Sequence, residues 1–121
     1  MTKTQNSKQY DLEDRTFEFA KRIRKFVAGL KKTPANMEDG RQLVKSSGST
    51  GANYIEANEA LSKKDFLMRI KICRKEAKES RYWLRLVDTG SDKELDRERK
   101  SLEDEARELT HIFGSIVTKS K

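Results

Sequence analysis

The sequence predicts an all-α protein, an up-down-up-down antiparallel bundle of four helices. Its single proline and six glycines leave long segments rich in Leu, Ile, Ala, Glu, Lys and Arg, which favour helix over strand. In these segments apolar residues recur every three or four positions, as along one face of a helix, and they do not alternate as in a strand. Four such segments joined by short connections are typical of an antiparallel bundle.

The first helix is expected to begin after Asp11, whose side chain can cap the free amides of its first turn. Six apolar residues then fall on one face: Leu12, Phe17, Ala20, Ile23, Val27 and Leu30. Phe19 and Phe26 form a second apolar strip beside this face. Because a helix in a monomeric bundle needs only one apolar face, we expect Phe19 and Phe26 to contact another subunit.

Thr33, followed by the only proline, predicts the start of a second helix that runs from about residue 35 to residue 60. Its interior contains Gly40, Gly48 and Gly51, and a glycine within a helix costs about 1 kcal/mol relative to alanine. A loop at SSGSTG is therefore the competing interpretation. We favour a helix, because small residues at helical spacing allow a neighbouring helix to approach closely. Its inward face would comprise Leu43, Val44, Ser47, Gly51, Tyr54 and Ile55.

Ser62 and Asp65 resemble a capping box, which predicts the start of the third helix. Its apolar residues follow alternating spacings of four and three and form a heptad seam: Phe66, Ile70, Cys73, Ala77, Ser80, Leu84 and Val87. Ile72, Trp83 and Leu86 lie to one side of this seam. We expect these three residues to contact another subunit.

The fourth helix is expected to follow Asp88-Thr89-Gly90, with Ser91 and Glu94 as its capping box. Its apolar pattern is interrupted only by an arginine at position 99: Leu95, Leu102, Ala106, Leu109, Phe113 and Ile116. The chain is therefore interpreted as a single four-helix bundle domain over residues 10–119. A disordered tail is expected at residues 1–9, and the final TKSK is a second candidate for disorder.

The protein is expected to be cytoplasmic. The N-terminal MTKTQNSKQYD has no apolar segment, unlike a secretory signal, and no apolar run approaches the roughly 20 residues that span a bilayer. The single cysteine, Cys73, excludes an internal disulfide, as is usual in a reducing compartment.

The sequence gives little support for an enzyme, and we expect neither a metal nor another cofactor. Glu108 and His111 have the E-x-x-H spacing of di-iron bundles, but those sites need two such motifs and His111 is the only histidine. Cys73 lies on the apolar seam without an obvious base to activate it. The sequence also lacks the glycine-rich loops that bind phosphate groups.

A group of polar residues marks the junction between the second and third predicted helices: Asn53, Glu56, Glu59, Glu76 and Glu79. Two buried carboxylates can act as an acid and a base. We favour instead a structural polar seam, in which these acids pair with Arg69, Arg74 or Arg81 across the hairpin. The sequence shows no group that would orient a substrate between them.

Positive charge is concentrated in two parts of the chain, whose net charge is +7. Residues 1–35 hold nine bases and four acids, and residues 61–90 hold the same numbers. The first and third helices should expose basic faces, with a tyrosine that can stack on a nucleic-acid base: Lys21, Arg22, Lys25, Lys71, Lys75, Lys78, Tyr82 and Arg85. Such faces favour RNA or a ribonucleoprotein as the partner. The alternative is a protein-interaction scaffold whose basic surface is incidental.

Three segments carry a resemblance to a known family: QLVKSSGSTGANYIEANEA, SKKDFLMRIKICRKEAKESRYWL and LEDEARELTHIFGSIV. They resemble the four-helix bundle proteins named for 23S rRNA intervening sequences, over most of the chain from about residue 17 to residue 117. The most specific part is residues 53–84, with family-like residues at Asn53, Glu56, Ala57, Glu59, Phe66, Glu76, Glu79 and Leu84.

The resemblance implies a homopentameric barrel of bundles, which would account for the second apolar strips on the first and third helices. The chain is also similar to the accessory variability protein of retroelements, a basic pentamer that binds a reverse transcriptase and nucleic acid. A reverse-transcriptase accessory protein is therefore one form that the scaffold alternative could take. The biochemical role of the family itself is poorly defined.

Overall fold

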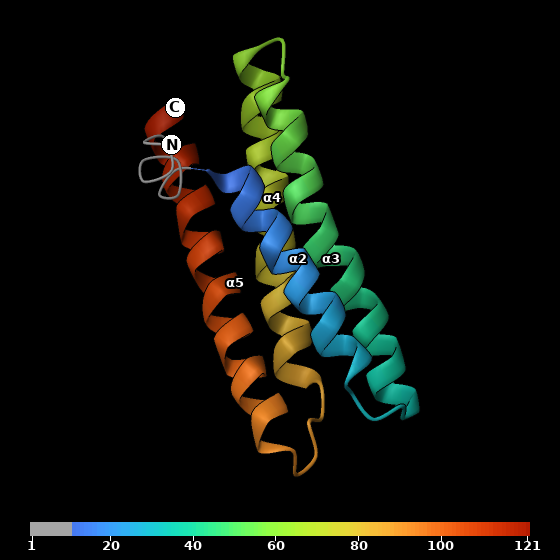
Figure 1. Cartoon of the computed structure of the whole chain (residues 1–121). Helices are drawn as coiled ribbons and strands as arrows, with labels where there is room; N and C mark the ends of the chain where they lie inside the picture. The colour runs from blue at the N-terminus through green and yellow to red at the C-terminus, as the bar shows by residue number, and fades with distance from the viewer. Residues whose placement is uncertain (1–10) are drawn as a thin grey trace, which may run out of the picture.

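The computed structural model describes residues 11–121, which form four α-helices and, within that range, no strand. In chain order these are α2 (Leu12–Ala28), α3 (Pro34–Asn58), α4 (Lys63–Leu86) and α5 (Lys93–Ser120). The turn between α3 and α4 lies at one end of the molecule, and the other two turns lie toward the opposite end (Figure 1). The predicted tail at residues 1–9 lies outside the described residues.

Three of the predicted helix starts are confirmed by capping side chains. Asp11, Thr33 and Ser62 precede α2, α3 and α4, and each side-chain oxygen accepts a hydrogen bond from the amide three residues later, at 3.1 Å. Each cap satisfies one of the amides that a helix N-terminus leaves without an intrahelical partner.

The predicted cap of the last helix is wrong by one residue. Asp92, not Ser91, precedes α5, and its carboxylate accepts a hydrogen bond from the amide of Leu95 at 3.0 Å. The chain turns at Gly90, which adopts a φ of 65° that glycine tolerates without strain. A carboxylate is favoured over a hydroxyl here because the N-terminus of a helix carries partial positive charge. At its other end, α5 continues through Ser120, so most of the final TKSK is helical.

The segment SSGSTG is part of α3, as predicted. Two glycines of α3 show why the helix uses small residues there. A Cβ atom on Gly40 would lie 2.9 Å from Val27 Cγ1, and one on Gly51 would lie 2.9 Å from Thr16 Oγ1. Both contacts are too short for a real Cβ, so these glycines allow α2 to pack closely against α3.

The predicted seam of α4 forms part of the core. Phe66 at its start is half-buried, and the remaining six members are buried: Ile70, Cys73, Ala77, Ser80, Leu84 and Val87. On α5 the buried residues include Leu102, Ala106, Leu109 and Phe113, as expected. Val117 is buried at the end of this helix, whereas the predicted Ile116 is only half-buried.

On α2, Ile23 is buried as predicted, but the phenylalanines have exchanged roles relative to the prediction. Phe19 and Phe26 are only 1% and 2% exposed, so they belong to the core of the chain and not to a subunit interface. Phe17 is 59% exposed and lies outside the core. Phe19 precedes Ile23 by four residues and lies on the same side of the helix, whereas Phe17 precedes it by six residues and lies about 120° away around the helix. On α3, the predicted core residue Ile55 is likewise 50% exposed.

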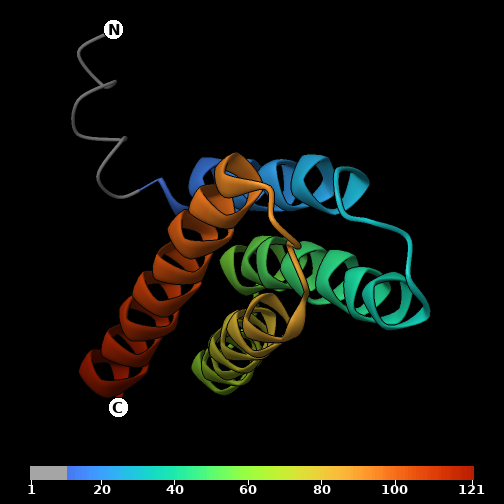
Figure 2. The same ribbon diagram turned by 90° about the horizontal axis from the view of Figure 1, so that it is seen from below.

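The helices follow one another around the bundle in chain order, as the view from below shows (Figure 2). α3 packs extensively against α4, and α4 against α5, whereas α2 contacts α5 only sparsely. Asn36 joins two turns at one end. Its side chain donates to the backbone carbonyls of Lys31 and Asp88 and accepts from the Asp88 amide, each at 3.0 Å. None of the described helices is apolar over the length that a bilayer requires.

Candidate nucleic-acid interface

The basic residues predicted on the third helix share the outer face of α4. Lys71, Lys75, Lys78, Tyr82 and Arg85 are all exposed and follow one another at spacings of four and three, which places them on one side of the helix. The rings of Tyr82 and Trp83 pack edge to face, with their centroids 5.0 Å apart. This contact leaves 55% of Tyr82 exposed. We call these five residues the α4 basic face.

Two of the charges on this face have acidic neighbours. Lys75 Nζ lies 3.9 Å from Glu76, and Arg85 Nε lies 3.9 Å from Glu103. Both distances are at the long end for an ion pair, and pairs with such exposed cations contribute little. Lys71 and Lys78 form no ion pair with any residue between 11 and 121. The face therefore retains most of its positive charge.

The basic residues predicted on the first helix are placed differently. Arg22 lies 3.1 Å from Glu98 and donates to Ser101 Oγ at 2.9 Å, so it links α2 to α5. Lys21 lies over the exposed ring of Phe17, with Nζ 5.5 Å from the ring centroid, and Lys25 is exposed. Since α2 packs against α3 and α5 rather than α4, this set faces a different side of the bundle from the α4 basic face.

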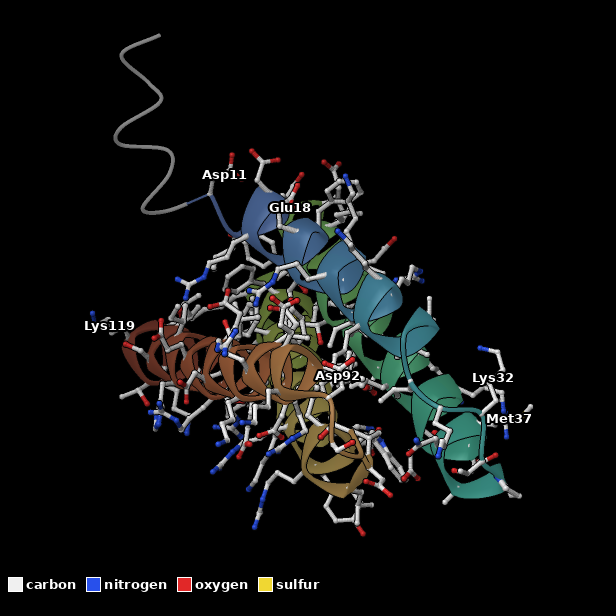
Figure 3. All side chains as sticks on the ribbon, turned by 60° about the horizontal axis from the view of Figure 1, so that its bottom comes forward. Asp11, Glu18, Lys32, Met37, Asp92 and Lys119 are labelled. Carbon is white, nitrogen blue, oxygen red and sulfur yellow. The ribbon has the colours of Figure 1, made fainter. Side chains whose placement is uncertain are left out.

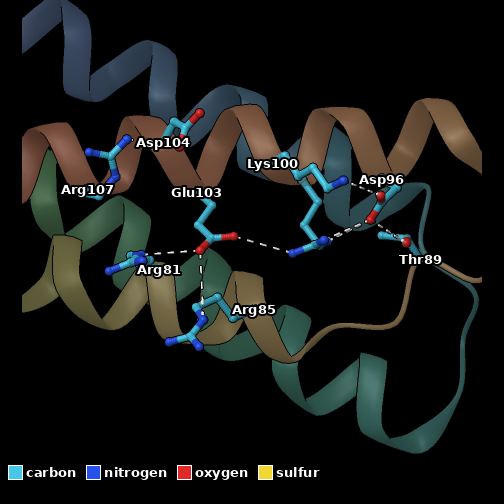
Figure 4. A network of polar contacts seen from close by, with 9 residues as sticks. Arg81, Arg85, Thr89, Asp96, Lys100, Glu103, Asp104 and Arg107 are labelled. Carbon is cyan, nitrogen blue, oxygen red and sulfur yellow. Dashed lines mark hydrogen bonds and ion pairs between the residues drawn. The ribbon is translucent and has the colours of Figure 1, made fainter.

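Figure 3 shows many nitrogen-tipped side chains on the side where α4 and α5 lie next to each other. One group of them surrounds Glu103 of α5, drawn close up in Figure 4. Glu103 lies 3.4 Å from Arg81 and 3.5 Å from Arg99, and Arg99 also pairs with Asp96 at 3.0 Å. The only signal of this network in the sequence was that Arg99 interrupts an apolar pattern.

The predicted polar seam forms only in part. Asn53 of α3 accepts a hydrogen bond from Arg69 of α4 at 3.1 Å, and therefore connects the two helices. Three of the predicted seam acids, Glu56, Glu59 and Glu79, are exposed and form no ion pair within residues 11–121. They do not make the expected pairs across the hairpin, because their positions lie on the outer sides of α3 and α4.

Glu76 is the one half-buried acid of that group. Its side chain is 16% exposed, and burial, reinforced by the neighbouring Glu79, raises the pKa of Glu76. Among residues 11–121, the only cation in ion-pair range of Glu76 is Lys75, at 3.9 Å. A contact that the sequence analysis missed lies on the same helix pair: the buried hydroxyls of Ser46 and Ser80 are hydrogen-bonded at 2.7 Å.

The remaining candidates for chemistry are a thiol and an imidazole. Cys73 is fully buried, and burial raises its pKa to about 12, so the thiolate that a nucleophile requires is scarce at neutral pH. His111 is exposed on α5. Within residues 11–121, no three side chains of the types His, Cys, Asp and Glu are grouped so that they could hold a metal ion.

Comparisons with known proteins agree with this fold. The family profile described as 23S rRNA-intervening sequence protein matches residues 8–115. A similar solved structure is that of a protein of unknown function from the S23 ribosomal protein family of Bacteroides thetaiotaomicron. It is 30% identical, with a TM-score of 0.71, and the match covers 87% of this chain and 96% of that one. No curated protein matches the sequence.

Proposed function

Because the chain belongs to the 23S rRNA-intervening sequence protein family, we propose that it is a non-enzymatic protein that binds RNA or a ribonucleoprotein. The observation that carries this proposal is the α4 basic face, where exposed lysines and an exposed tyrosine follow one another along a single helix. Lysines neutralise phosphates and release their counterions, and an aromatic ring can stack on an unpaired base. The face thus combines the two contacts that single-stranded RNA requires.

We also propose that the chain is an up-down-up-down bundle that assembles into a homo-oligomer, with a pentamer as the expected state. The alternation of the turns between the two ends of the molecule supports this order of helices. Leu86, which is 50% exposed, and the half-buried Ile72 and Trp83 are the candidate subunit contacts on α4. Assembly would repeat the α4 basic face in every subunit and raise the affinity for a long RNA through multivalency.

The test of RNA binding is an affinity measurement on ribosomal RNA fragments and unrelated RNA across a series of salt concentrations. Replacing Lys71, Lys75 and Lys78 together by Gln should weaken binding and reduce the slope of log affinity against log salt by about 2. The matched control replaces three exposed lysines that lie outside α4: Lys31, Lys32 and Lys93. Equal losses in both triple variants, or no binding at low salt, would contradict the proposal.

A scaffold for protein–protein interaction is the second candidate, of which a reverse-transcriptase accessory protein is one form. It is favoured by an apolar groove of about 410 Å³ between α2 and α3, whose lining includes the exposed side chains of Phe17 and Ile55. Exposed apolar grooves commonly bind helices of other proteins. Binding of a protein partner that is insensitive to salt and lost in Phe17→Ala would support this function over RNA binding.

A further inference from the structure

A polar pocket lies between α4 and α5, away from the Glu103 network. It has a volume of about 500 Å³ and opens to solvent. Its lining within residues 11–121 contains a guanidinium, an imidazole, three hydroxyls and a glycine, and no carboxylate: Arg74, Thr110, His111, Gly114, Ser115 and Thr118. A site made of hydrogen-bond donors and positive charge, with no acid, is suited to an anion.

Arg74 differs from two other arginines that lie between helices. Arg15 is 2.7 Å from Glu105, and Arg81, on the same helix as Arg74, is 3.4 Å from Glu103. Arg74 has no carboxylate within ion-pair distance among residues 11–121. Its planar guanidinium, which can donate two parallel hydrogen bonds to a phosphate, is therefore not neutralised by the chain.

The hydroxyl groups of the pocket divide into two kinds. Thr110 donates to the carbonyl of Ala106 at 2.7 Å, and Thr118 donates to the carbonyl of Gly114 at 3.1 Å. These threonines use their protons within the helix. Ser115, like the His111 ring, makes no side-chain hydrogen bond to another residue between 11 and 121. Both therefore remain available as donors to a ligand beside Arg74.

Gly114 forms part of the pocket lining in the interior of α5, where glycine is less favourable than alanine. An added Cβ would lie 3.6 Å from Arg74 Cδ, which is an ordinary van der Waals distance. Packing in the described chain thus does not require a glycine at this position, in contrast to Gly40 and Gly51. The missing methyl group leaves space directly beside the aliphatic part of the Arg74 side chain.

We propose that this pocket binds one phosphate group of an RNA strand that lies along α4, with Arg74 as the principal ligand and Ser115 and His111 as further donors. The inference rests on the proposed function of the α4 basic face. Lys71 and Lys78 are three and four residues from Arg74, so they are its neighbours on the helix surface. A strand that contacts these two lysines passes beside the pocket.

The first test compares Arg74→Gln with Arg107→Gln in the full chain, using the RNA-binding measurement across salt concentrations. Arg107 is an exposed arginine of α5 that is paired with Asp104 at 3.2 Å. Because both substitutions replace an arginine by glutamine, they remove the same charge. Arg74→Gln should weaken binding about tenfold and reduce the salt slope by about one, whereas Arg107→Gln should change affinity less than about twofold. Equal effects of the two substitutions would overturn the pocket while leaving RNA binding intact.

The second test uses inorganic phosphate, and does not depend on RNA binding. In wild-type protein, saturable NMR shifts of the Gly114 and Ser115 amides are expected, and these should be lost in Arg74→Gln. Sodium chloride at equal ionic strength is the control. If wild-type protein binds no RNA at low salt, the proposed function fails, and this titration still decides on the pocket. If the wild type shows no saturable shifts with phosphate, the proposed phosphate site at Arg74 is overturned.

Gly114→Ala provides a variant in which stability and binding should change in opposite directions. The melting temperature should rise, because alanine favours a helix interior, whereas RNA affinity should fall, because the methyl group occupies the pocket. A higher melting temperature with unchanged affinity would overturn the pocket. A lower melting temperature would show that a glycine is needed there for packing, and would overturn the role of Gly114 in the pocket.

Discussion

The α3–α4 and α2–α5 interfaces hold their helices together by different chemistry. Between α3 and α4, small buried side chains face each other, and the hydroxyls of Ser46 and Ser80 lie 2.7 Å apart. Between α2 and α5, Arg15 reaches Glu105 with two hydrogen bonds of 2.7 and 2.9 Å, in a part of the surface where the arginine side chain is still 30% exposed.

This difference determines how each interface depends on its surroundings. Small side chains bring two helices into extensive van der Waals contact, which salt does not weaken. A guanidinium–carboxylate pair spans a longer gap and is stabilised by a Coulomb attraction that dissolved ions screen when the pair is partly exposed. We therefore expect α2–α5 to be the weaker interface, to separate first on partial unfolding, and to respond to ionic strength.

The largest expected effect comes from overfilling the α3–α4 interface. Ser80→Leu inserts a large side chain at a position that is 0% exposed, and should lower the free energy of unfolding by about 3 kcal/mol. Urea unfolding followed by circular dichroism measures this loss. Ser115→Leu, at an exposed position of α5, should change stability by less than about 0.5 kcal/mol. Similar losses in both would mean that α3 and α4 do not pack closely at Ser80.

The next effect comes from breaking the α2–α5 interface. Arg15→Gln should cost about 1 kcal/mol at low salt, because it leaves Glu105 and Glu108 without their shared partner. The difference from wild type should shrink in about 1 M sodium chloride, while that of Ser80→Leu should persist. Arg97→Gln, at an exposed arginine that forms no ion pair within residues 11–121, is the control. If the stability loss of Arg15→Gln did not depend on salt, the α2–α5 interface would not be the salt-sensitive one.

A third and similar effect tests the N-terminus of α5, the helix that takes part in the weaker interface. Asp92→Ala should cost about 1 kcal/mol, because it removes the side chain that accepts from the Leu95 amide. Ser91→Ala should cost almost nothing, because Ser91 does not cap the helix. Thermal unfolding of the two variants measured side by side distinguishes them. A larger loss of stability from Ser91→Ala than from Asp92→Ala would mean that Ser91 caps α5, as the sequence predicted.

The smallest effect concerns Glu76, on the α3-facing side of α4. Because burial raises its pKa in the folded state, folding favours the protonated acid, and the stability of the wild type relative to Glu76→Gln falls as pH rises through that pKa. Glu76→Gln should therefore be more stable than wild type at pH 7, by about 0.5 kcal/mol or less, and should lose this advantage near pH 4. Lower stability of the variant at pH 7 would indicate that the attraction to Lys75 outweighs burial.

The sequence was sufficient to predict the features that depend on one helix alone. The seam of α4 and the α4 basic face both follow from the periodicity of residues 63–86. Each of the three correctly predicted helix caps depends on one side chain just before its helix. The assignment of the phenylalanines on α2 was wrong although the spacing favours the observed one, because Phe19 is four residues from Ile23 and Phe17 is six. The spacing does not show which helix packs against that side; α3, which passes closely at Gly51, is known only from the structure.

The candidate site was predicted less completely for the same physical reason. Arg22 was expected to bind nucleic acid, but its partner Glu98 lies far along the chain, and their pairing depends on how α5 is placed beside α2. The pocket at Arg74 likewise requires α5 to bring Ser115 and His111 beside it. Contacts of this kind depend on which helices are neighbours and on their axial offset, neither of which the periodicity of one helix specifies.

Because of the hydrogen bonds of Asn36, the two ends of the bundle should differ in how well they tolerate an insertion. They join the turn that precedes α3 to the turn that follows α4, so an insertion near Lys31 or Asp88 would break a link between distant parts of the chain. The turn between α3 and α4 has no comparable link to the rest of residues 11–121, and Leu61 there is 100% exposed. A fluorescent reporter, an affinity tag or new chain termini made by circular permutation belong at Leu61.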